Sequence, residues 1–280
     1  MSAGKLGLHD GIPDAVYRSA QGLSASEAKI LLGKRPPAPS PALAFGTLFH
    51  TLVLEPDRAG EYLALDAEKI GVKADGSKAE NPTMTNAWKK AVKEAEQDGK
   101  TVVAQTDWDA ACAMRDAVYA HKAAAEVMDL CTRHEVSGWA EHETGALVKG
   151  RIDLLGPGVV ADLKSTKDAD PERFGWTCAD FMYHVSAADY RDIAMADGES
   201  VEAVIFINAE KEPPYRVSVV DLAPRAIDLG RDRMTEACRR WLDLGTVQLP
   251  SYGDGYHRID LPPKAYSAGY ADYTEFEGIE

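Results

Sequence analysis

Two apolar segments joined by Gly156-Pro157-Gly158 limit the fold of this chain more than any other feature. Leu147–Leu155 and Val159–Ser165 have the length and composition of β-strands, and a glycine–proline break between such segments predicts a hairpin. The second segment is almost continuously apolar, as in a central strand, yet it carries Asp162 and Lys164. Charged side chains in a buried strand need partners or a function.

The register of this hairpin decides which of its charges face one another. A two-residue turn at Pro157-Gly158 places Asp153 opposite Asp162, whereas a three-residue turn shifts the register and needs a bulge to restore it. Lys164 is two residues beyond Asp162 and therefore on the same face of its strand. Two facing carboxylates repel each other unless a positive charge lies between them.

This set of charges favours a hard divalent cation beside a phosphodiester. Mg²⁺ prefers oxygen ligands and sites that it shares with substrate phosphates, and Mn²⁺ is expected to substitute for it. Such an ion lowers the pKa of water, polarises a phosphate and stabilises the leaving oxygen. Lys164 could hold the attacking water or offset charge in the transition state. The alternative, a solvated surface ion pair, fits poorly with the apolar residues around Asp162.

The remaining sequence predicts alternating helices and strands. Ser24 and Glu27 have the spacing of a capping box, which predicts the start of a helix. Ala42–Leu54 is apolar enough for a buried helix, and Thr106 is expected to cap a long helix that continues to about Leu130. Further predicted elements are a strand from Arg133, helices at 180–196 and from Pro224, and strands at 201–208 and 215–220.

One α/β domain is the simplest organisation of the chain. We expect a central mixed β-sheet flanked by helices over residues 23–250, with helical additions at both ends, a flexible segment at 1–22 and a loosely packed tail at 251–280. Residues 66–100 are rich in lysine and contain Gly and Pro breaks, which predict a mobile loop that leads into a short helix.

Charge and cysteine content exclude several classes of protein. The net charge of −14 argues against tight non-specific coating of DNA and against binding to anionic membranes. No run of about 18 apolar residues exists and the first ten residues lack the apolar stretch of a signal peptide, so a cytoplasmic location is the expectation. The four cysteines form no Cys-x-x-Cys pair, which argues against a zinc ribbon or a disulfide framework.

Four motifs, taken in order, resemble the RecB-like branch of the PD-(D/E)xK nucleases, and within it most of all the exonuclease domain of phage RecE. They are Leu23–Ser26, the Gly-x-x-x-His pattern of Gly46–His50, the Gly-Arg-Ile-Asp of Gly150–Asp153 and the Asp-Leu-Lys-Ser-Thr of Asp162–Thr166. The resemblance covers about residues 20–250. It implies a restriction-endonuclease-like fold.

The resemblance also implies roles for particular side chains. His50, Asp153 and Asp162 are expected to bind the metal ion, with Lys164 as the catalytic lysine beside them. His50 alone would suggest a hydrogen-bonded core histidine, and the other three motifs favour the metal instead. Glu135, on the neighbouring strand, could add a carboxylate or could equally face solvent.

The helix after the Asp-x-Lys strand departs from the family pattern Gln-x-x-x-Tyr. Ser186 takes the place of the glutamine and Tyr190 is retained. A serine is shorter and has one donor, so a DNA or water contact is weakened or is rebuilt, for which His184 is a candidate. Ser186, Tyr190 and Arg151 are expected to contact DNA.

The lysine-rich segment could also contact DNA. Lys73 and Lys89 could guide a duplex, and Trp88 could stack on a terminal base. The alternative is an ordinary solvated loop. Neither reading follows from the catalytic motifs.

The leading hypothesis is a Mg²⁺-dependent exonuclease that degrades double-stranded DNA from 5′ to 3′ and exposes 3′ single strands for phage-type recombination. The resemblance implies double-stranded DNA ends as substrate, a RecT-like single-strand annealing protein as partner, a ring of copies around DNA, and a bacterial or phage-infected cell. The scattered cysteines predict that there is no iron–sulphur cluster. Two alternatives remain: a structure- or sequence-specific endonuclease, and a non-catalytic module that binds DNA ends or a partner.

Overall fold

The computed structural model describes residues 4–36, 38, 40–73, 75–251, 253, 255–256 and 258–260. The chain divides into two units, Met1–Leu249 and Pro250–Glu280. Every helix and strand among the described residues belongs to the first unit. Most of the predicted loosely packed tail, residues 261–280, lies outside the described residues.

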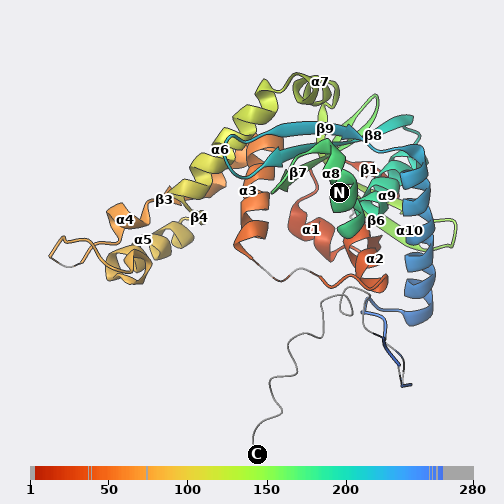
Figure 1. Ribbon diagram of the computed structural model, residues 1–280, viewed down its shortest axis with the longest axis horizontal. Coiled ribbons are helices and arrows are strands. Elements are labelled where there is room, and N and C mark those ends of the chain that lie inside the picture. The colour runs from red at the N-terminus through yellow and green to blue at the C-terminus, as the bar shows by residue number, and fades with distance from the viewer. Residues whose placement is uncertain are drawn as a thin grey trace, which may run out of the picture. The chain divides into compact units, whose positions relative to one another are not determined.

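A seven-stranded mixed sheet forms the centre of the first unit (Figure 1). Its strands are β1 (Gly7–His9), β2 (Leu23–Ser24), β5 (Arg133–Glu141), β6 (Leu147–Gly156), β7 (Gly158–Thr166), β8 (Val201–Glu210) and β9 (Val217–Asp221). They lie in the order β1-β5-β6-β7-β8-β9, and β2 pairs with β6. The β7–β8 and β2–β6 pairs are parallel and the others antiparallel. The prediction of a mixed α/β sheet is confirmed.

One group of helices packs its apolar side chains on the sheet through a single cluster of buried residues. The helices are α3 (Pro41–Leu54), α6 (Gln105–Ala120) and α7 (Lys122–Leu130). Phe49, Met114 and Val127 from these helices pack with Leu163 and Ile207 of β7 and β8. Because α3 lies in this layer, it brings His50 to the same strands.

A second group of helices buries the remaining sheet residues. The helices are α8 (Pro171–Asp180), α9 (Tyr183–Ala196) and α10 (Pro224–Leu244). Phe174, Ala188 and Ile227 pack with Val160 and Phe206. Successive side chains of a strand point to opposite faces, which is why neighbouring residues of β7 enter different clusters.

The central hairpin has the register that a two-residue turn predicts. Gly156 pairs with Val159, and Leu154 pairs with Ala161. Gly158 has a φ of 76°, a left-handed conformation that glycine adopts without steric cost. Continuation of this register places Asp153 opposite Asp162.

Residues 4–22 belong to the fold, so the prediction of a flexible segment there is wrong. β1 pairs with β5, and the short helix α1 (Asp14–Ser19) follows it. Ile12 is buried, and the Trp139 indole donates a hydrogen bond to the Gln21 carbonyl over 3.0 Å. A three-residue strand of half-buried side chains has no periodicity that a sequence could reveal.

Residues 56–104 contain more regular structure than the mobile loop predicted for 66–100. The elements are η1 (Pro56–Glu61), β3 (Tyr62–Leu65), α4 (Ala67–Ile70), η2 (Pro82–Met84), α5 (Asn86–Gln97) and β4 (Thr101–Ala104). β3 and β4 pair in parallel as a separate two-stranded sheet. Figure 1 shows α4 and α5 extending away from the central sheet, and α5 is the predicted short helix.

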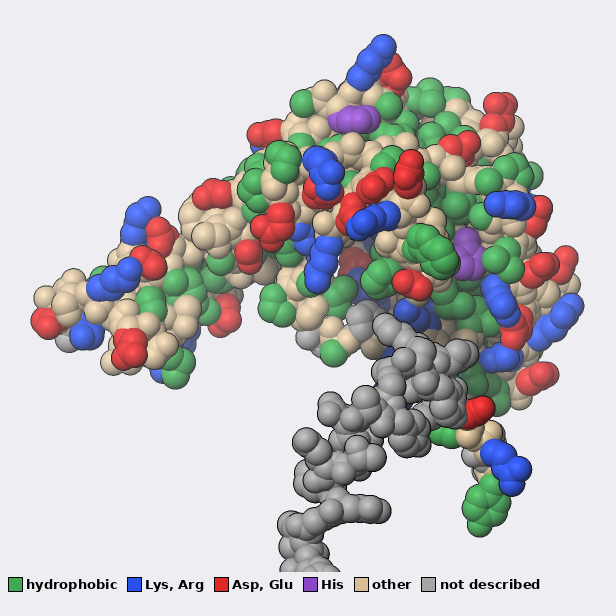
Figure 2. Space-filling view, viewed as in Figure 1, with side chains coloured by type: hydrophobic (Ala, Val, Ile, Leu, Met, Phe, Trp, Pro, Cys, Tyr) green, Lys and Arg blue, Asp and Glu red, His purple; other side chains and the backbone are tan. Residues whose placement is uncertain are grey.

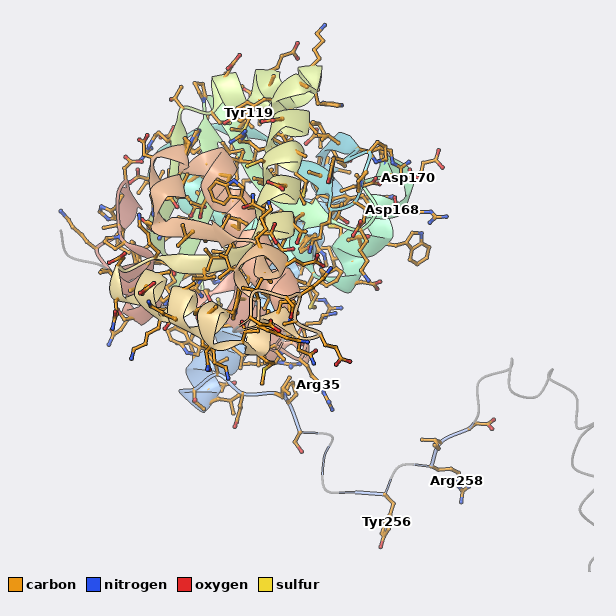
Figure 3. The ribbon with its side chains drawn as sticks, turned by 90° about the vertical axis from the view of Figure 1, so that its left-hand side faces the viewer. Arg35, Tyr119, Asp168, Asp170, Tyr256 and Arg258 are labelled. Atoms are coloured by element: carbon orange, nitrogen blue, oxygen red, sulfur yellow. The ribbon has the colours of Figure 1, made fainter. Side chains whose placement is uncertain are left out.

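The long helix predicted from Thr106 to about Leu130 is interrupted. α6 begins at Gln105 after an Ala104 cap, so Thr106 is not the cap, and His121 separates α6 from α7. The Nδ1 atom of His121 accepts a hydrogen bond from the Ala124 amide, which restarts the helix. Near the end of α6 the hydroxyl of Tyr119, labelled in Figure 3, donates to the Val53 carbonyl of α3.

The helix predicted at 180–196 is α9, which begins at Tyr183 and ends at Ala196, and the separate helix α8, which ends at Asp180, was not predicted. Met182 between them has a left-handed backbone, with a φ of 52°. A non-glycine residue in this conformation has no clear signature in the sequence, so the break was not predicted.

The crossing of α9 and α10 depends on Gly230. A Cβ atom there would lie 2.1 Å from the His184 carbonyl oxygen, too close for any side chain. We expect Gly230→Ala to lower the free energy of unfolding by about 2–3 kcal/mol, since the helices would have to separate. Urea unfolding measures this change.

Gly175 in α8 is the matched control, because a Cβ atom there meets nothing within 4 Å. Gly175→Ala should raise the free energy of unfolding by about 0.5–1 kcal/mol, since alanine is the better helix former. Equal effects of the two substitutions would contradict the close helix crossing.

Candidate metal centre

One histidine and two carboxylates from three elements meet at the edge of the central hairpin. His50 of α3, Glu135 of β5 and Asp153 of β6 each offer a ligand atom, and these atoms all lie within 4.8 Å of one another. The Nδ1 atom of His50 is 3.7 Å from the Oδ2 atom of Asp153. Groups this close, from helix and sheet, can surround one small ion.

Strand register brings Glu135 to this group. His134 pairs with Leu154 and Val136 with Ile152, so Glu135 lies across from Asp153. Glu135 has a φ of 51°, an uncommon conformation for a residue other than glycine that costs on the order of 1–3 kcal/mol. The surrounding β5–β6 pairing holds this strained backbone in place, as is frequent at functional sites.

Arg151 binds Glu135 and is not available for the predicted DNA contact. Its Nε atom donates to Glu135 Oε2 over 2.6 Å and its Nη1 atom donates to the Ile12 carbonyl. Only 13% of the Arg151 side chain is exposed. Arg151 therefore orients one Glu135 oxygen and leaves the other for a ligand.

Asp153 lies where strands β6 and β7 separate. Its Oδ2 atom accepts a hydrogen bond from the Leu163 amide over 2.9 Å, in place of a backbone partner on β6. On β7 the Lys164 ammonium donates to Oδ1 of Asp162. Oδ2 of Asp162 is buried and has no hydrogen-bond partner among the described residues.

The pKa values of these groups reflect burial and mutual repulsion. Burial, and then the charge of Asp162, raise the pKa of Asp153 well above its ordinary value. Burial also opposes ionisation of Asp162, but the charge of Lys164 next to it lowers the pKa of Asp162 overall. Burial, and then Lys164, lower the pKa of His50, which favours a neutral imidazole able to bind metal.

The donor set fits a hard divalent cation. Carboxylate oxygens suit Mg²⁺ and Mn²⁺, and an imidazole nitrogen is acceptable to Mn²⁺ in particular. Oδ2 of Asp162 has no hydrogen-bond partner among the described residues, and the pKa of Asp153 is raised. Both features are expected of buried carboxylates that have too little positive charge beside them. A bound cation would favour the ionised form of both carboxylates.

The structure brings together the four residues that carry the sequence motifs, His50, Asp153, Asp162 and Lys164. The three close ligands, however, are His50, Glu135 and Asp153, and Asp162 lies outside that group. Glu135, for which solvent was an equal alternative, therefore has a more central position than predicted. Asp162 is instead the partner of Lys164.

The glycine of the Gly46–His50 motif lies against strand β7. A Cβ atom at Gly46 would be 3.5 Å from Ser165 Oγ, an ordinary contact. The helix therefore approaches the strand here, although an alanine would also fit.

Ser186 and Tyr190 of α9 lie near the acidic group without facing open solvent. Ser186 is buried and accepts a hydrogen bond from the Lys29 ammonium over 2.7 Å. Burial, and then the charges of Asp162 and Asp153, raise the pKa of Tyr190. The ring of Tyr190 packs against Gly150 of β6, where a Cβ atom would lie 3.0 Å from it.

Lys29 of α2 (Ala25–Leu31) is the site residue that the sequence did not reveal. Burial, and then repulsion by Lys164, lower its pKa to about 8. Its ammonium group donates the hydrogen bond that Ser186 accepts, and the proposed role of His184 stays a prediction. In the sequence, Lys29 stands out only because it follows the Leu23–Ser26 motif. That position does not predict a role at the site, because only the fold brings Lys29 there.

Lys73, Trp88 and Lys89 lie elsewhere, in the segment between β3 and β4. Lysines and carboxylates are mixed over this segment in Figure 2, with ion pairs such as Lys78–Glu68 and Lys90–Glu94. The structure does not bring these three residues to the acidic group, so their contact with DNA stays a prediction.

The chain matches the family model described as a PDDEXK-like domain of unknown function (DUF3799) over residues 17–253. This match covers most of the chain. The chain belongs to this family. The prediction of the PD-(D/E)xK superfamily and of its fold class is thereby confirmed.

Solved structures agree with the fold of this PDDEXK-like domain. A protein of Eubacterium rectale that is provisionally named an exonuclease superposes with a TM-score of 0.56 at 14% identity, covering 93% of this chain and 100% of that one. A phage-related exonuclease from Haemophilus somnus 129PT has a TM-score of 0.33 at 15% identity, covering 65% and 95%. The second score is too low to support an argument. No curated protein matches the sequence significantly.

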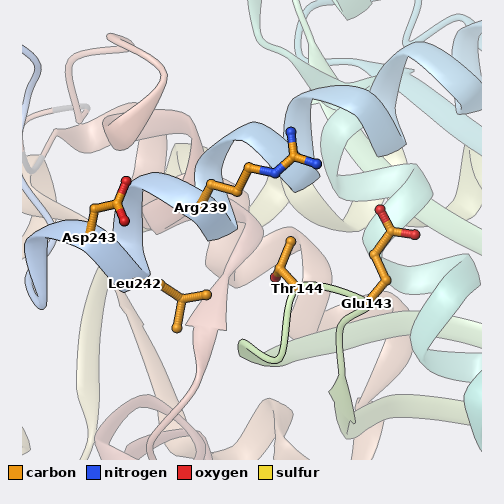
Figure 4. A pocket seen from close by; sticks show the side chains of 5 residues that line it. All are labelled: Glu143, Thr144, Arg239, Leu242 and Asp243. Atoms are coloured by element: carbon orange, nitrogen blue, oxygen red, sulfur yellow. The ribbon is translucent and has the colours of Figure 1, made fainter.

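Other features of the PDDEXK-like domain do not compete with the acidic group as a metal site. An open hollow of about 550 Å³ is lined by Glu143, Thr144, Arg239, Leu242 and Asp243. Figure 4 shows its two carboxylates at opposite ends. The four free cysteines belong to four different apolar clusters, so their thiols do not converge.

No helix among the described residues has both the length and the apolar character needed to cross a membrane.

Divalent ions should stabilise the PDDEXK-like domain through Asp153. At a free ion concentration about 100 times Kd, binding adds about 2.7 kcal/mol to the stability of the folded state. We expect Asp153→Asn to abolish this gain and, by removing a repelling buried charge, to stabilise the metal-free protein. Thermal unfolding with Mn²⁺, Mg²⁺ or chelator measures both effects.

Asp129→Asn on the exposed end of α7 is the control, and it should leave the ion-dependent gain unchanged. An undiminished gain in Asp153→Asn would place the ion elsewhere.

Asp189 of α9 should make stability depend on pH. Burial, and then Asp192, raise its pKa well above the ordinary value, and one of its oxygens lacks a hydrogen bond among the described residues. Between about pH 3.9 and the raised pKa the folded protein binds more protons than the unfolded chain, so this contribution to stability falls as pH rises. We expect Asp189→Asn to raise the stability at neutral pH by on the order of 1 kcal/mol and to flatten this dependence.

Urea unfolding of the chelated protein from pH 5 to 8 tests this, with exposed Asp180→Asn as the control. If the Asp189→Asn variant retains the full pH dependence of the wild type, Asp189 is not its source.

Proposed function

We propose that this protein is a divalent-metal-dependent deoxyribonuclease that hydrolyses phosphodiester bonds of DNA. The observation that carries the proposal is the convergence of His50, Glu135 and Asp153 within 4.8 Å, beside the Asp162–Lys164 pair. When bound, Mg²⁺ or Mn²⁺ would activate water and neutralise charge on a phosphate. His50, Glu135 and Asp153 would hold the ion, with Asp162 as an additional ligand on the β7 side.

Lys164 provides the positive charge that the reaction needs next to the phosphate. Burial lowers the pKa of Lys164, but the charges of Asp162 and Asp153 raise it overall, so the ammonium stays protonated. With 22% of its side chain exposed, Lys164 is accessible from the site. It would stabilise the charge that develops on the phosphate oxygens, while Asp162 restrains its position.

The finer proposal is an exonuclease that degrades double-stranded DNA from 5′ to 3′ to expose 3′ single strands for phage-type recombination. It is supported by the resemblance of the sequence motifs to the RecE exonuclease domain and by the exonuclease name of the similar Eubacterium rectale structure. Mg²⁺ as the physiological ion, a RecT-like annealing partner, a ring of copies around DNA and a cytoplasmic location belong to this proposal.

The other residues proposed to contact DNA lie in two separate parts of the protein. Ser186 and Tyr190 would act close to the cleaved strand, and Lys73, Trp88 and Lys89 would meet a duplex farther from the site. Arg151 would act only indirectly, through Glu135.

Digestion of linear duplexes labelled at either the 5′ or the 3′ end tests the proposed reaction. With Mg²⁺ we expect early release of the 5′ label, and with chelator no release. A circular plasmid should stay intact. We expect Lys164→Met to lower the rate by about 100-fold or more, because it removes the charge next to the phosphate, and Asp162→Ala to be similarly impaired.

Lys122→Met is the matched control, because Lys122 is 91% exposed on α7. It should cleave like the wild type. Cleavage of the plasmid would favour the endonuclease, and equal activity in Asp162→Ala would refute the site. Binding of DNA ends without any hydrolysis would favour the non-catalytic module.

A further inference from the structure

A series of stacked aromatic rings leads from the core to the surface beside the proposed active site. Phe206 of β8 is fully buried, Tyr183 is half-buried and Phe181 is 53% exposed. The ring centroids of Phe206 and Tyr183 are 5.9 Å apart with planes 25° from parallel, and those of Tyr183 and Phe181 are 5.5 Å apart at 18°. The exposed end of the series is therefore supported by a rigid core.

The backbone between α8 and α9 is shaped to produce this stack. Phe181 and Tyr183 flank Met182, which has a left-handed conformation unusual for its residue type. An exposed phenylalanine in a strained connection is costly for folding alone, because the ring remains in contact with water. An exposed ring that is held in this way is available to a ligand.

Lysines accompany the rings. The ammonium groups of Lys164 and Lys29 lie 5.1 and 5.5 Å from the centroid of the Tyr183 ring. The ammonium group of Lys34 lies 5.3 Å from the centroid of the Phe181 ring and donates to the Asp180 carbonyl. In a chain with a net charge of −14, three lysines that follow two stacked rings form a local positive track.

The combination of rings and ammonium groups identifies the class of ligand. Single-stranded nucleic acid offers free base faces for stacking and a phosphate for each base, whereas the bases inside a duplex are already stacked on both sides. The track begins at Lys164, the lysine paired with Asp162, so a strand on it would be continuous with the strand at the metal centre.

We propose that Phe181 and Tyr183, with Lys29 and Lys34, bind single-stranded DNA that adjoins the cleaved phosphate, with one base stacked on Phe181. This inference rests on the proposed function, since it takes DNA as the substrate. It assigns a strand-binding role to residues outside the acidic group. The base stacks on the Phe181 ring, and Lys34, whose ammonium group lies over that ring without the ligand, turns to contact a phosphate.

Binding of a fluorescein-labelled oligothymidylate to the full chain, in chelator so that nothing is hydrolysed, tests the proposal by fluorescence anisotropy. We expect Phe181→Ala and Phe181→Leu to raise Kd by about 5- to 100-fold, because each removes the stacking surface, and Phe181→Trp to bind at least as tightly as the wild type. The leucine variant keeps apolar bulk, so its loss of binding separates stacking from folding.

Lys34→Gln should reduce the slope of log K against log salt concentration by about 0.7, the value for one phosphate contact on a single strand, whereas Phe181→Ala should leave that slope unchanged. Trp176→Ala is the matched aromatic control: Trp176 is 77% exposed on α8 and outside the stack. Lys122→Gln is the matched lysine control. Both should bind like the wild type.

Wild-type affinity in Phe181→Ala, Phe181→Leu and Lys34→Gln would overturn the inference. A loss of affinity as large in Trp176→Ala as in Phe181→Ala would also overturn it. Binding is measured in chelator and cleavage with Mg²⁺, so the two results are independent. If the wild-type protein binds the oligonucleotide but does not hydrolyse DNA with Mg²⁺, the proposed nuclease is refuted and the strand site is not. Cleavage with unaltered binding by the variants refutes the strand site alone.

Discussion

The burial of three carboxylates in one row of the sheet is the constraint on which the rest of the site depends. Glu135, Asp153 and Asp162 occupy corresponding positions of three neighbouring strands, and two of them are nearly inaccessible to water. Such a row is unstable without compensating positive charge. Arg151 provides that charge at one end and Lys164 at the other, which leaves the middle, Asp153, as the least compensated group.

The helices around the sheet determine how that compensation is arranged. α3 adds a neutral imidazole rather than a charge, since burial and Lys164 lower the pKa of His50. α2 adds Lys29, whose pKa is lowered for the same two reasons. The N-terminal segment holds Arg151 through the Ile12 carbonyl. The site thus depends on segments that lie far ahead of the catalytic strands in the sequence, since α3 ends at Leu54 and β6 begins only at Leu147.

An acidic protein can still present a path for a negatively charged strand, because the sign of the total charge does not determine the local field. Most basic residues outside the site are paired with nearby carboxylates, as for Arg231 with Asp192 and Arg240 with Glu236. Lys29 and Lys34 instead lie over aromatic rings, and Lys164, although paired with Asp162, also lies over the Tyr183 ring. Aromatic faces favour cations without neutralising them, so these ammonium groups keep their charge for a ligand.

The sequence alone determined that β6 and β7 form a hairpin, and it left two registers open, of which the structure has the one with the two-residue turn. It also determined α2 and α3, where a capping box and a continuous apolar segment are local signals. The positions of Asp153, Asp162 and Lys164 follow from these local rules. Their metal chemistry could therefore be expected before the fold was known.

Only the tertiary structure decided which other groups complete the site. Glu135 reaches Asp153 through a left-handed backbone that no alternation pattern predicts, and Arg151 is directed to Glu135 rather than to DNA. Lys29 meets Tyr183 and Lys34 meets Phe181 because the end of α2 lies beside the connection between α8 and α9. These contacts join residues far apart in the chain, and their free energy comes from burial and charge that exist only once the elements have assembled.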